Sequence, residues 1–142
     1  KSTCSRGRCG AVLIYDDAIL AWGYDSPPCH QPSNRKCSCS SPSIRKPKSD
    51  RTCCIHAEWR VLLHAHTLGY DLSEAILFFV RVDEHGCIQR SGNPYCTVCS
   101  RLALEVGIGY WALFHESGIT KYDAVHYNDL SYDYDLILQS TT

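Results

Sequence analysis

The stretch "IHAEWRVLLHAH" (residues 55–66) combines a helical pattern with a histidine and a glutamate two positions apart. Apolar residues recur every three or four positions between Cys54 and Gly69, which predicts an amphipathic helix that ends at Gly69. A second stretch, "NPYCTVCSRLALEVGI" (residues 93–108), predicts a helix over residues 96–107. The chain therefore places reactive side chains at the starts of two helices.

Three of these side chains form a set of ligands suited to zinc. His56, Cys96 and Cys99 supply one imidazole nitrogen and two thiolates, and they leave the fourth tetrahedral position free for water. Cysteines at positions i and i+3 lie on the same helix face, and a helix N-terminus lowers the pKa of a thiol. Glu58 is too close to His56 for a comfortable fourth ligand, but it is well placed to move a proton from a metal-bound water. The alternative is a core histidine beside a structural cysteine pair.

The other segments predict strands around these two helices. Residues 9–25 read as a hairpin with Asp16-Asp17 at the turn, and residues 26–51, rich in proline and serine, read as a long loop. The remaining strands are expected over residues 74–83, 108–117 and 118–127, while residues 128–142 resist assignment. The order β-β-loop-α-β-α-β-β predicts an α/β fold: a three-layer α/β/α sandwich with a mixed, about five-stranded sheet.

Length and composition indicate one folded domain over residues 1–142. Hydrophobic residues make up 44% of the 142 positions, enough to form a core, so bulk disorder is excluded. No apolar run approaches the ~20 residues of a membrane span, and the start, "KSTCSRGRCG", is not typical of a signal peptide. Because the chain begins with Lys and contains no Met, we expect a piece of a longer polypeptide.

Charge and cysteine content add two expectations. Residues 1–51 carry nine Lys/Arg against four Asp/Glu, which favours a polyanionic ligand at this end of the chain, although a solvated basic loop explains it equally well. The ten cysteines are accompanied by histidines at ligand-like spacing. This pattern favours thiolates on metal in a reducing compartment over a disulfide network.

The segments "HAE" (56–58) and "PYCTVC" (94–99) resemble the signature of the zinc-dependent cytidine deaminase superfamily, H-x-E followed by P-C-x-x-C. The strand expected between the half-motifs and the helix after each also match that superfamily's order. The resemblance implies that His56, Cys96 and Cys99 bind zinc and that Glu58 transfers protons. It further implies hydrolytic attack at C4 of cytosine, or at C6 of adenine, with release of ammonia.

Three further residues are candidates for substrate binding. The family usually has Pro directly before the first Cys, whereas here Tyr95 intervenes, so the contact to the substrate amino group is expected from Pro94 or Tyr95. The Tyr95 ring is an alternative stacking platform for the base. Trp59 is either part of the base pocket or a core residue.

A second resemblance is to deoxycytidylate deaminases, through "GYDSPP" (23–28) before a Cys/His-rich loop. It implies that Asp25 contacts the sugar; a simple turn residue is the alternative. It also implies a second zinc, for which free or disulfide-forming thiols are the alternative. Its candidate ligands are Cys29, His30, Cys37, Cys39, Cys53 and Cys54.

The substrate class depends on weaker signals. The basic residues of 26–51 suit phosphate contacts, and Trp22, Tyr24, Trp59, Tyr95 and Trp111 are candidates for stacking on unpaired bases. These features favour single-stranded nucleic acid over a free nucleotide, and cytosine is the expected base. "CTVCSRLALEVGI" and "GITKYDAVHYN" resemble deaminase domains of bacterial polymorphic toxins. That resemblance implies a secreted effector acting in a target-cell cytoplasm and a cognate immunity protein. A free-nucleotide deaminase, an adenine deaminase and a zinc-stapled binding module are the alternatives.

Overall fold

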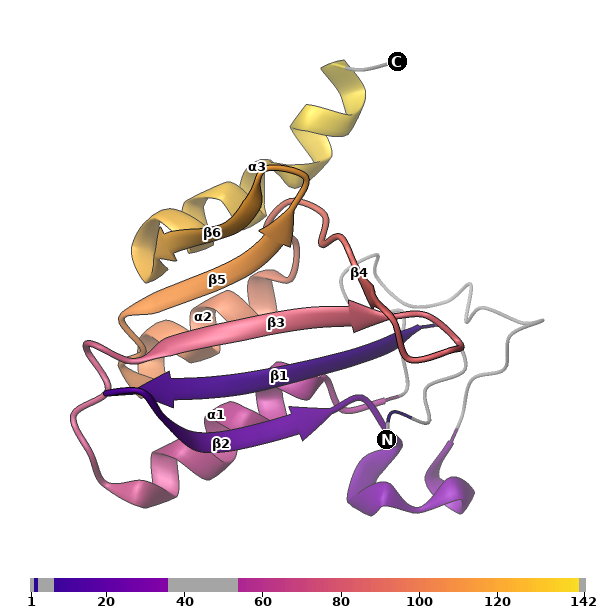
Figure 1. Ribbon diagram of the computed structural model, residues 1–142, viewed down its shortest axis with the longest axis vertical. Coiled ribbons are helices and arrows are strands. Elements are labelled where there is room, and N and C mark those ends of the chain that lie inside the picture. Colours follow the sequence, from indigo (N-terminus) through magenta and orange to yellow (C-terminus); the bar gives the residue numbers. More distant parts are fainter. Residues whose placement is uncertain (1, 3–6, 36–53, 141–142) are drawn as a thin grey trace.

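The computed structural model describes residues 2, 7–35 and 54–140, with side chains as far as residue 134. Its sheet has the strand order β2-β1-β3-β5-β6, and a short strand β4 pairs with β3 at one end (Figure 1). The β3–β5 pair is parallel and the other pairs are antiparallel, so the sheet is mixed. The strands are β1 (Arg8–Tyr15), β2 (Ala18–Tyr24), β3 (Ile76–Val82), β4 (Ile88–Gln89), β5 (Tyr110–His115) and β6 (Gly118–Asp123).

The three helices are α1 (Ala57–Leu68), α2 (Thr97–Val106) and α3 (Ala124–Ser140). The predicted α/β class with a mixed sheet is confirmed, and the predicted helices and strands are found within a few residues of their expected bounds. None of the described helices combines the length and the apolar character needed to cross a membrane.

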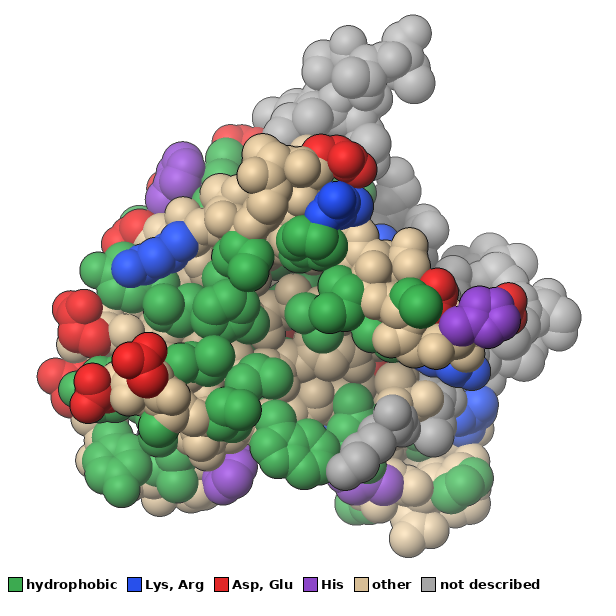
Figure 2. All heavy atoms as spheres, in the orientation of Figure 1, with side chains coloured by type: hydrophobic (Ala, Val, Ile, Leu, Met, Phe, Trp, Pro, Cys, Tyr) green, Lys and Arg blue, Asp and Glu red, His purple; other side chains and the backbone are tan. Residues whose placement is uncertain are grey.

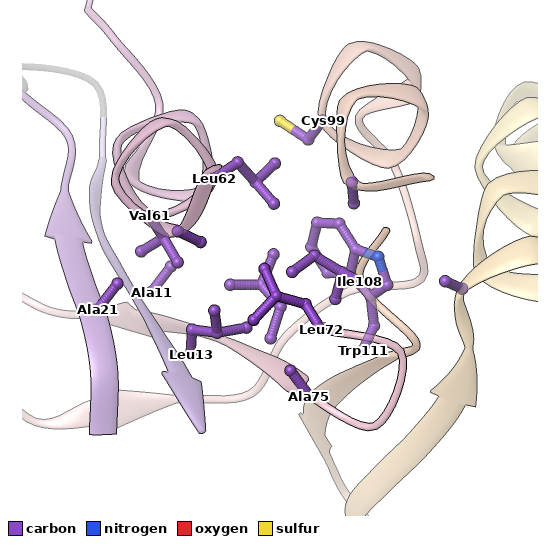
Figure 3. Close-up of a cluster of buried hydrophobic side chains, with 14 of the residues drawn as sticks. Ala11, Leu13, Ala21, Val61, Leu62, Leu72, Ala75, Cys99, Ile108 and Trp111 are labelled. Carbon is purple, nitrogen blue, oxygen red and sulfur yellow. The ribbon is translucent and has the colours of Figure 1, made fainter. Parts of the chain in front are cut away.

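The core lies between the helices and one face of the sheet. Register pairs Leu13 with both Ala21 and Leu77, and Leu77 with Trp111, so these four buried residues share that face. Val61 and Leu62 point toward them from α1 (Figure 3). Tyr127 of α3 stacks on Trp111 with ring centroids 4.1 Å apart, so α3 packs on the same face. Trp111 is therefore a core residue and not the base-stacking residue that its sequence position suggested.

The opposite face of the sheet carries partly exposed apolar side chains. Val12 pairs with Trp22 and with Phe78, and Trp22 retains 55% of its surface. Hydrophobic side chains gather over this face in Figure 2. In the described part of the chain, all three helices pack on the face of the sheet that carries Leu13. They form one of the two helical layers of the expected α/β/α sandwich.

Three segments differ in detail from the sequence-based expectations. The last predicted strand, 118–127, ends at Asp123, whose carboxylate accepts hydrogen bonds from the N–H groups of Val125 and His126 and so starts α3. Strand β4 lies between the predicted strand 74–83 and the predicted helix 96–107, where no strand was expected. In the long loop 26–51, residues 28–30 and 32–34 form short 3₁₀ turns, and residues 36–51 lie outside the described residues.

Candidate metal centre and catalytic pocket

The N-terminus of α1 is held by a residue from another part of the chain. His56, directly before the helix, has extended backbone angles and makes no side-chain capping bond. Instead, the Asp25 carboxylate accepts a 2.7 Å hydrogen bond from the N–H of Ala57. Backbone hydrogen bonds between Ser26 and Ile55 tie the two segments together. These contacts fix where His56 and Glu58 lie relative to the end of β2.

The N-terminus of α2 is formed by its own cysteines. Cys96 is the N-cap, and its sulfur accepts a hydrogen bond from the N–H of Cys99 at 3.3 Å. At the other end, Gly107 adopts φ 90°, a left-handed conformation that glycine tolerates, and its N–H bonds back to Ala103 and Leu104. The Cys96–Cys99 spacing thus places both sulfurs on the first turn, as the sequence predicts.

The structure brings His56, Cys96 and Cys99 together into one cluster whose ligand atoms all lie within 4.8 Å of one another. The His56 Nδ1 atom is 3.3 Å from the Cys99 sulfur and 3.6 Å from the Cys96 sulfur. A tetrahedral zinc ion with Zn–N of about 2.0 Å and Zn–S of about 2.3 Å separates nitrogen from sulfur by roughly 3.6 Å. The donor types and their spacing therefore fit zinc.

Charges within the cluster determine which ligand atoms hold a proton before a metal binds. A hydrogen bond from Cys99 and the neighbouring His56 lower the pKa of Cys96 to about 5, against the effect of burial. Burial and the adjacent Cys96 thiolate raise the pKa of Cys99 well above its usual value. Burial alone would lower the pKa of His56, but its hydrogen bond to Cys96 and the nearby Glu58 raise it to about 9. In the metal-free protein Cys96 is therefore a thiolate, whereas Cys99 and His56 hold protons that a metal ion would displace.

Glu58 lies beside this cluster as a buried carboxyl group. It belongs to the first turn of α1 and retains only 7% of its surface. Burial raises its pKa to about 7, although His56 opposes this shift. A carboxyl group with a pKa near neutrality can both accept and donate a proton at physiological pH, which is what a general acid–base catalyst requires.

A cavity of about 350 Å³ opens onto His56, Glu58 and Cys96. This volume falls at the lower end of the range for small-molecule sites. Asp25 and Tyr95, both predicted from the sequence, line it. Tyr95 packs edge-on against Tyr134, with ring centroids 4.6 Å apart. The cavity is also lined by residues that sequence reasoning missed: Cys9, Phe79, Arg81, Leu113, Tyr127 and Tyr134.

Trp59 and Pro94 lie outside the described lining of this cavity. The Trp59 ring stacks on the His56 ring, with centroids 4.6 Å apart and an angle of 14° between planes. It therefore supports a candidate metal ligand from behind rather than forming part of the base pocket. Pro94 is buried just before Tyr95. A backbone contact from Pro94 to the substrate stays a prediction.

The candidates for a second zinc do not come together among the described residues. Cys29 is exposed and Cys54 is buried. Both ring nitrogens of His30 are occupied, one by Ser26 and the other by Arg60. The other three candidate ligands, Cys37, Cys39 and Cys53, lie outside the described residues.

Comparison with known proteins places the fold. No family model matches the chain, and no curated protein matches it. Solved structures do match. The apo dCMP deaminase of the cyanophage S-TIM5 aligns with a TM-score of 0.50 at 20% identity, over 78% of this chain and 68% of that one. The cytidine deaminase of Burkholderia pseudomallei aligns with a TM-score of 0.54 at 16% identity, over 89% of this chain and 82% of that one. The chain therefore has the cytidine deaminase fold.

Proposed function

We propose that this protein is a zinc-dependent hydrolytic deaminase that converts cytosine to uracil in single-stranded nucleic acid. The observation that carries the proposal is the joint placement of the ligand cluster and Glu58. The cluster has its ligand atoms within 4.8 Å of one another, and the buried Glu58 shares a cavity with two of its members. A structural zinc site has four protein ligands, whereas here the described residues supply three. A zinc ion held by these three residues would keep one coordination position for water, as catalytic zinc sites do.

The reaction adds water to C4 of cytosine and releases ammonia. His56, Cys96 and Cys99 would hold the zinc, which when bound acts as a Lewis acid that activates water at neutral pH. The Glu58 carboxylate accepts a proton from the attacking water and then delivers it to the leaving amino group. In the metal-free protein, burial raises the pKa of Glu58 to about 7, so this carboxyl group holds a proton more readily than an exposed glutamate does.

The cavity walls suit a planar base. Phe79, Leu113 and Tyr127 give the interior an apolar surface, and burial of Tyr127 raises the pKa of its hydroxyl, so this group stays neutral. Tyr95 lies at the cavity with 51% of its surface exposed. An exposed aromatic ring at the entrance is suited to stacking on a base that has left its helix.

The biological role that we propose is a toxin domain. The resemblance of residues 96–108 and 118–128 to deaminase domains of bacterial polymorphic toxins supports it. Under this proposal the domain is a secreted effector that acts in a target-cell cytoplasm, and an immunity protein protects the producing cell. The basic excess of residues 1–51 supports a nucleic-acid substrate.

A free nucleotide of the dCMP type is the second candidate substrate, favoured by the fold match to a dCMP deaminase. Zinc-loaded protein should be incubated separately with dCMP and with a single-stranded cytosine-containing oligonucleotide, and ammonia and uracil measured. Uracil in the oligonucleotide supports the proposal, whereas ammonia from dCMP alone replaces it with the second candidate. Glu58→Gln should abolish product while zinc content stays unchanged. Full activity of this variant would show that Glu58 is not the proton carrier.

A further inference from the structure

A second hollow adjoins the candidate catalytic cavity at the end of the sheet. Three arginines contribute to its lining: Arg8 from β1, Arg81 from β3 and Arg90 just after β4. No Asp or Glu is among its described lining residues. All three arginines are exposed, so this hollow presents positive charge to the solvent, where it attracts anions.

Intramolecular contacts leave much of this charge unneutralised. The guanidinium of Arg8 donates a 2.9 Å hydrogen bond to the backbone carbonyl of Glu84, which orients the group without cancelling its charge. Arg90 lies 4.0 Å from the centre of the Phe114 ring and 3.6 Å from Glu116, a carboxylate whose side chain is 91% exposed. Such an exposed ion pair is weak. In the described part of the chain, no carboxylate lies within ion-pair distance of Arg81.

Arg81 connects the two hollows. Together with Gly7 it lines both of them. It pairs across the sheet with Cys9, which also lines the catalytic cavity, and with Gln89 of β4. Phe79, two residues earlier on β3, lines the catalytic cavity, and side chains two apart on a strand share a face. A group bound beside Arg81 in the second hollow is therefore next to the space that would hold the base.

We propose that Arg81, with Arg8 and Arg90, binds the substrate phosphate adjacent to the target base. This inference rests on the proposed function, which requires a base in the first cavity. The guanidinium group of arginine can donate bidentate hydrogen bonds to phosphate oxygens. A phosphate is also the anionic group that a nucleotide carries near its base. The site therefore selects phosphate-bearing substrates over free nucleosides, whether the phosphate belongs to a nucleotide or to a nucleic-acid backbone.

The experiment compares binding of three probes to zinc-loaded protein carrying Glu58→Gln, which prevents turnover. The probes are deoxycytidine, dCMP and a short single-stranded oligodeoxycytidine. Arg81→Gln is added to this background, and Lys121→Gln serves as the matched control. Lys121 lies over the Tyr110 ring on β6 and lines neither hollow, but its replacement removes the same charge. Arg81→Lys tests whether charge alone suffices.

We expect Arg81→Gln to weaken binding of a phosphate-bearing probe by about tenfold, the scale of one charge-assisted hydrogen bond. Deoxycytidine binding should not change, and Lys121→Gln should leave all three affinities unchanged. A loss restricted to the oligonucleotide identifies a backbone phosphate, with a salt dependence reduced by about one unit of slope. A loss for dCMP identifies a terminal phosphate.

Two results would overturn the phosphate site: equal weakening of deoxycytidine and dCMP by Arg81→Gln, or no weakening of any probe. Failure of the proposed function has a separate signature. In that case wild-type, zinc-loaded protein releases no ammonia from any probe, while the effect of Arg81→Gln on oligonucleotide binding still decides whether these arginines form a phosphate site.

Discussion

The carboxylate of Asp25 caps a helix to which it does not belong, accepting a 2.7 Å hydrogen bond from the N–H of Ala57 at the start of α1. Asp25 follows β2 directly, so this bond joins the end of a strand to the residue after His56. Burial raises the pKa of Asp25, while the hydrogen bond from Ala57 and the neighbouring His56 oppose the shift. The residue predicted to contact a sugar thus also positions the candidate metal ligand and Glu58.

Asp25→Ala should destabilise the protein and weaken zinc binding together. Loss of a helix cap costs about 1 kcal/mol of unfolding free energy, and the freed N-terminus of α1 no longer holds His56 in place. Chemical denaturation and a competition assay with a zinc chelator measure the two effects. A variant with unchanged zinc affinity would contradict the positioning role.

Asp25→Asn separates the cap from any contact with substrate. The amide oxygen of asparagine still accepts from the Ala57 N–H, so stability and zinc affinity should stay near wild type. If Asp25 also contacts the substrate sugar, the KM of Asp25→Asn rises while its zinc content is unchanged. Unchanged KM would restrict Asp25 to the role of a cap.

Replacing Cys99 by alanine should remove bound zinc. Cys99 is fully buried, and its sulfur is 3.3 Å from His56 Nδ1, so no described side chain can take its place as a ligand. Zinc content measured by elemental analysis should fall from about one ion per chain to near zero, since three protein ligands are the minimum of catalytic zinc sites. The control is Cys87→Ala, an exposed cysteine in the β3–β4 turn. Equal zinc in both variants would exclude the proposed ligand set.

The sequence predicted the catalytic cluster because its determinants are local. The spacing of Cys96 and Cys99 places both sulfurs on one helical turn, whatever the rest of the chain does. The apolar periodicity of residues 54–69 likewise predicted α1 without tertiary information. What remained was that the two helix starts meet. Helix α1 leads into β3 and α2 leads into β5, which is parallel to β3, so both helices begin at the same end of the sheet.

The part of the cavity wall formed by Tyr127 and Tyr134 could not be predicted because it depends on α3. Residues 124–134 mix polar, acidic and aromatic side chains, so they show no clear apolar stripe. The buried face of this helix consists of Ala124, Tyr127 and Ser131, of which only Ala124 and Tyr127 are apolar. One signal in the sequence did indicate this helix. Asp123 is a typical N-cap residue, and the buried positions 124, 127 and 131 that follow it are three and four residues apart. The role of Arg81 was equally hidden, because it depends on strand pairing with Cys9 and Gln89.

The ionisation of Glu58 predicts a pH-dependent stability of the metal-free protein. The folded pKa is about 7 against an ordinary value of 4.5. Because the folded state holds this proton more tightly, the associated stability is fully present below pH 4.5 and is lost as the pH rises to about 7. A shift of this size corresponds to about 3 kcal/mol.

Comparison with Glu58→Gln isolates this effect. In metal-free protein under reducing conditions, the unfolding free energy of wild type minus that of Glu58→Gln should fall between pH 4.5 and pH 7 and then stay constant. Urea titrations at a series of pH values give this difference. A difference independent of pH would mean that Glu58 is solvated in the metal-free state.

Gly23→Ala should weaken zinc binding by displacing helix α1, although Gly23 is not itself a candidate zinc ligand. Gly23 lies on β2, against the first turn of α1, and a Cβ atom there would be 2.6 Å from the Ala57 carbonyl oxygen and 2.9 Å from Arg60 Cβ. Neither neighbour is the flexible end of a side chain, so α1 must shift. Overpacking of this kind costs about 1–3 kcal/mol of unfolding free energy.

The matched control is Gly10→Ala on the neighbouring strand β1. A Cβ at Gly10 would meet Val80 Cγ2 at 3.5 Å, an ordinary van der Waals contact, so stability should change little. Because Ala57 directly follows His56, the shift forced by Gly23→Ala also moves the imidazole relative to the two sulfurs. We therefore expect weaker zinc binding in Gly23→Ala alone, measured by chelator competition at a temperature where both variants remain folded. Equal zinc affinity in the two variants would show that the position of His56 does not depend on the packing of α1 against β2.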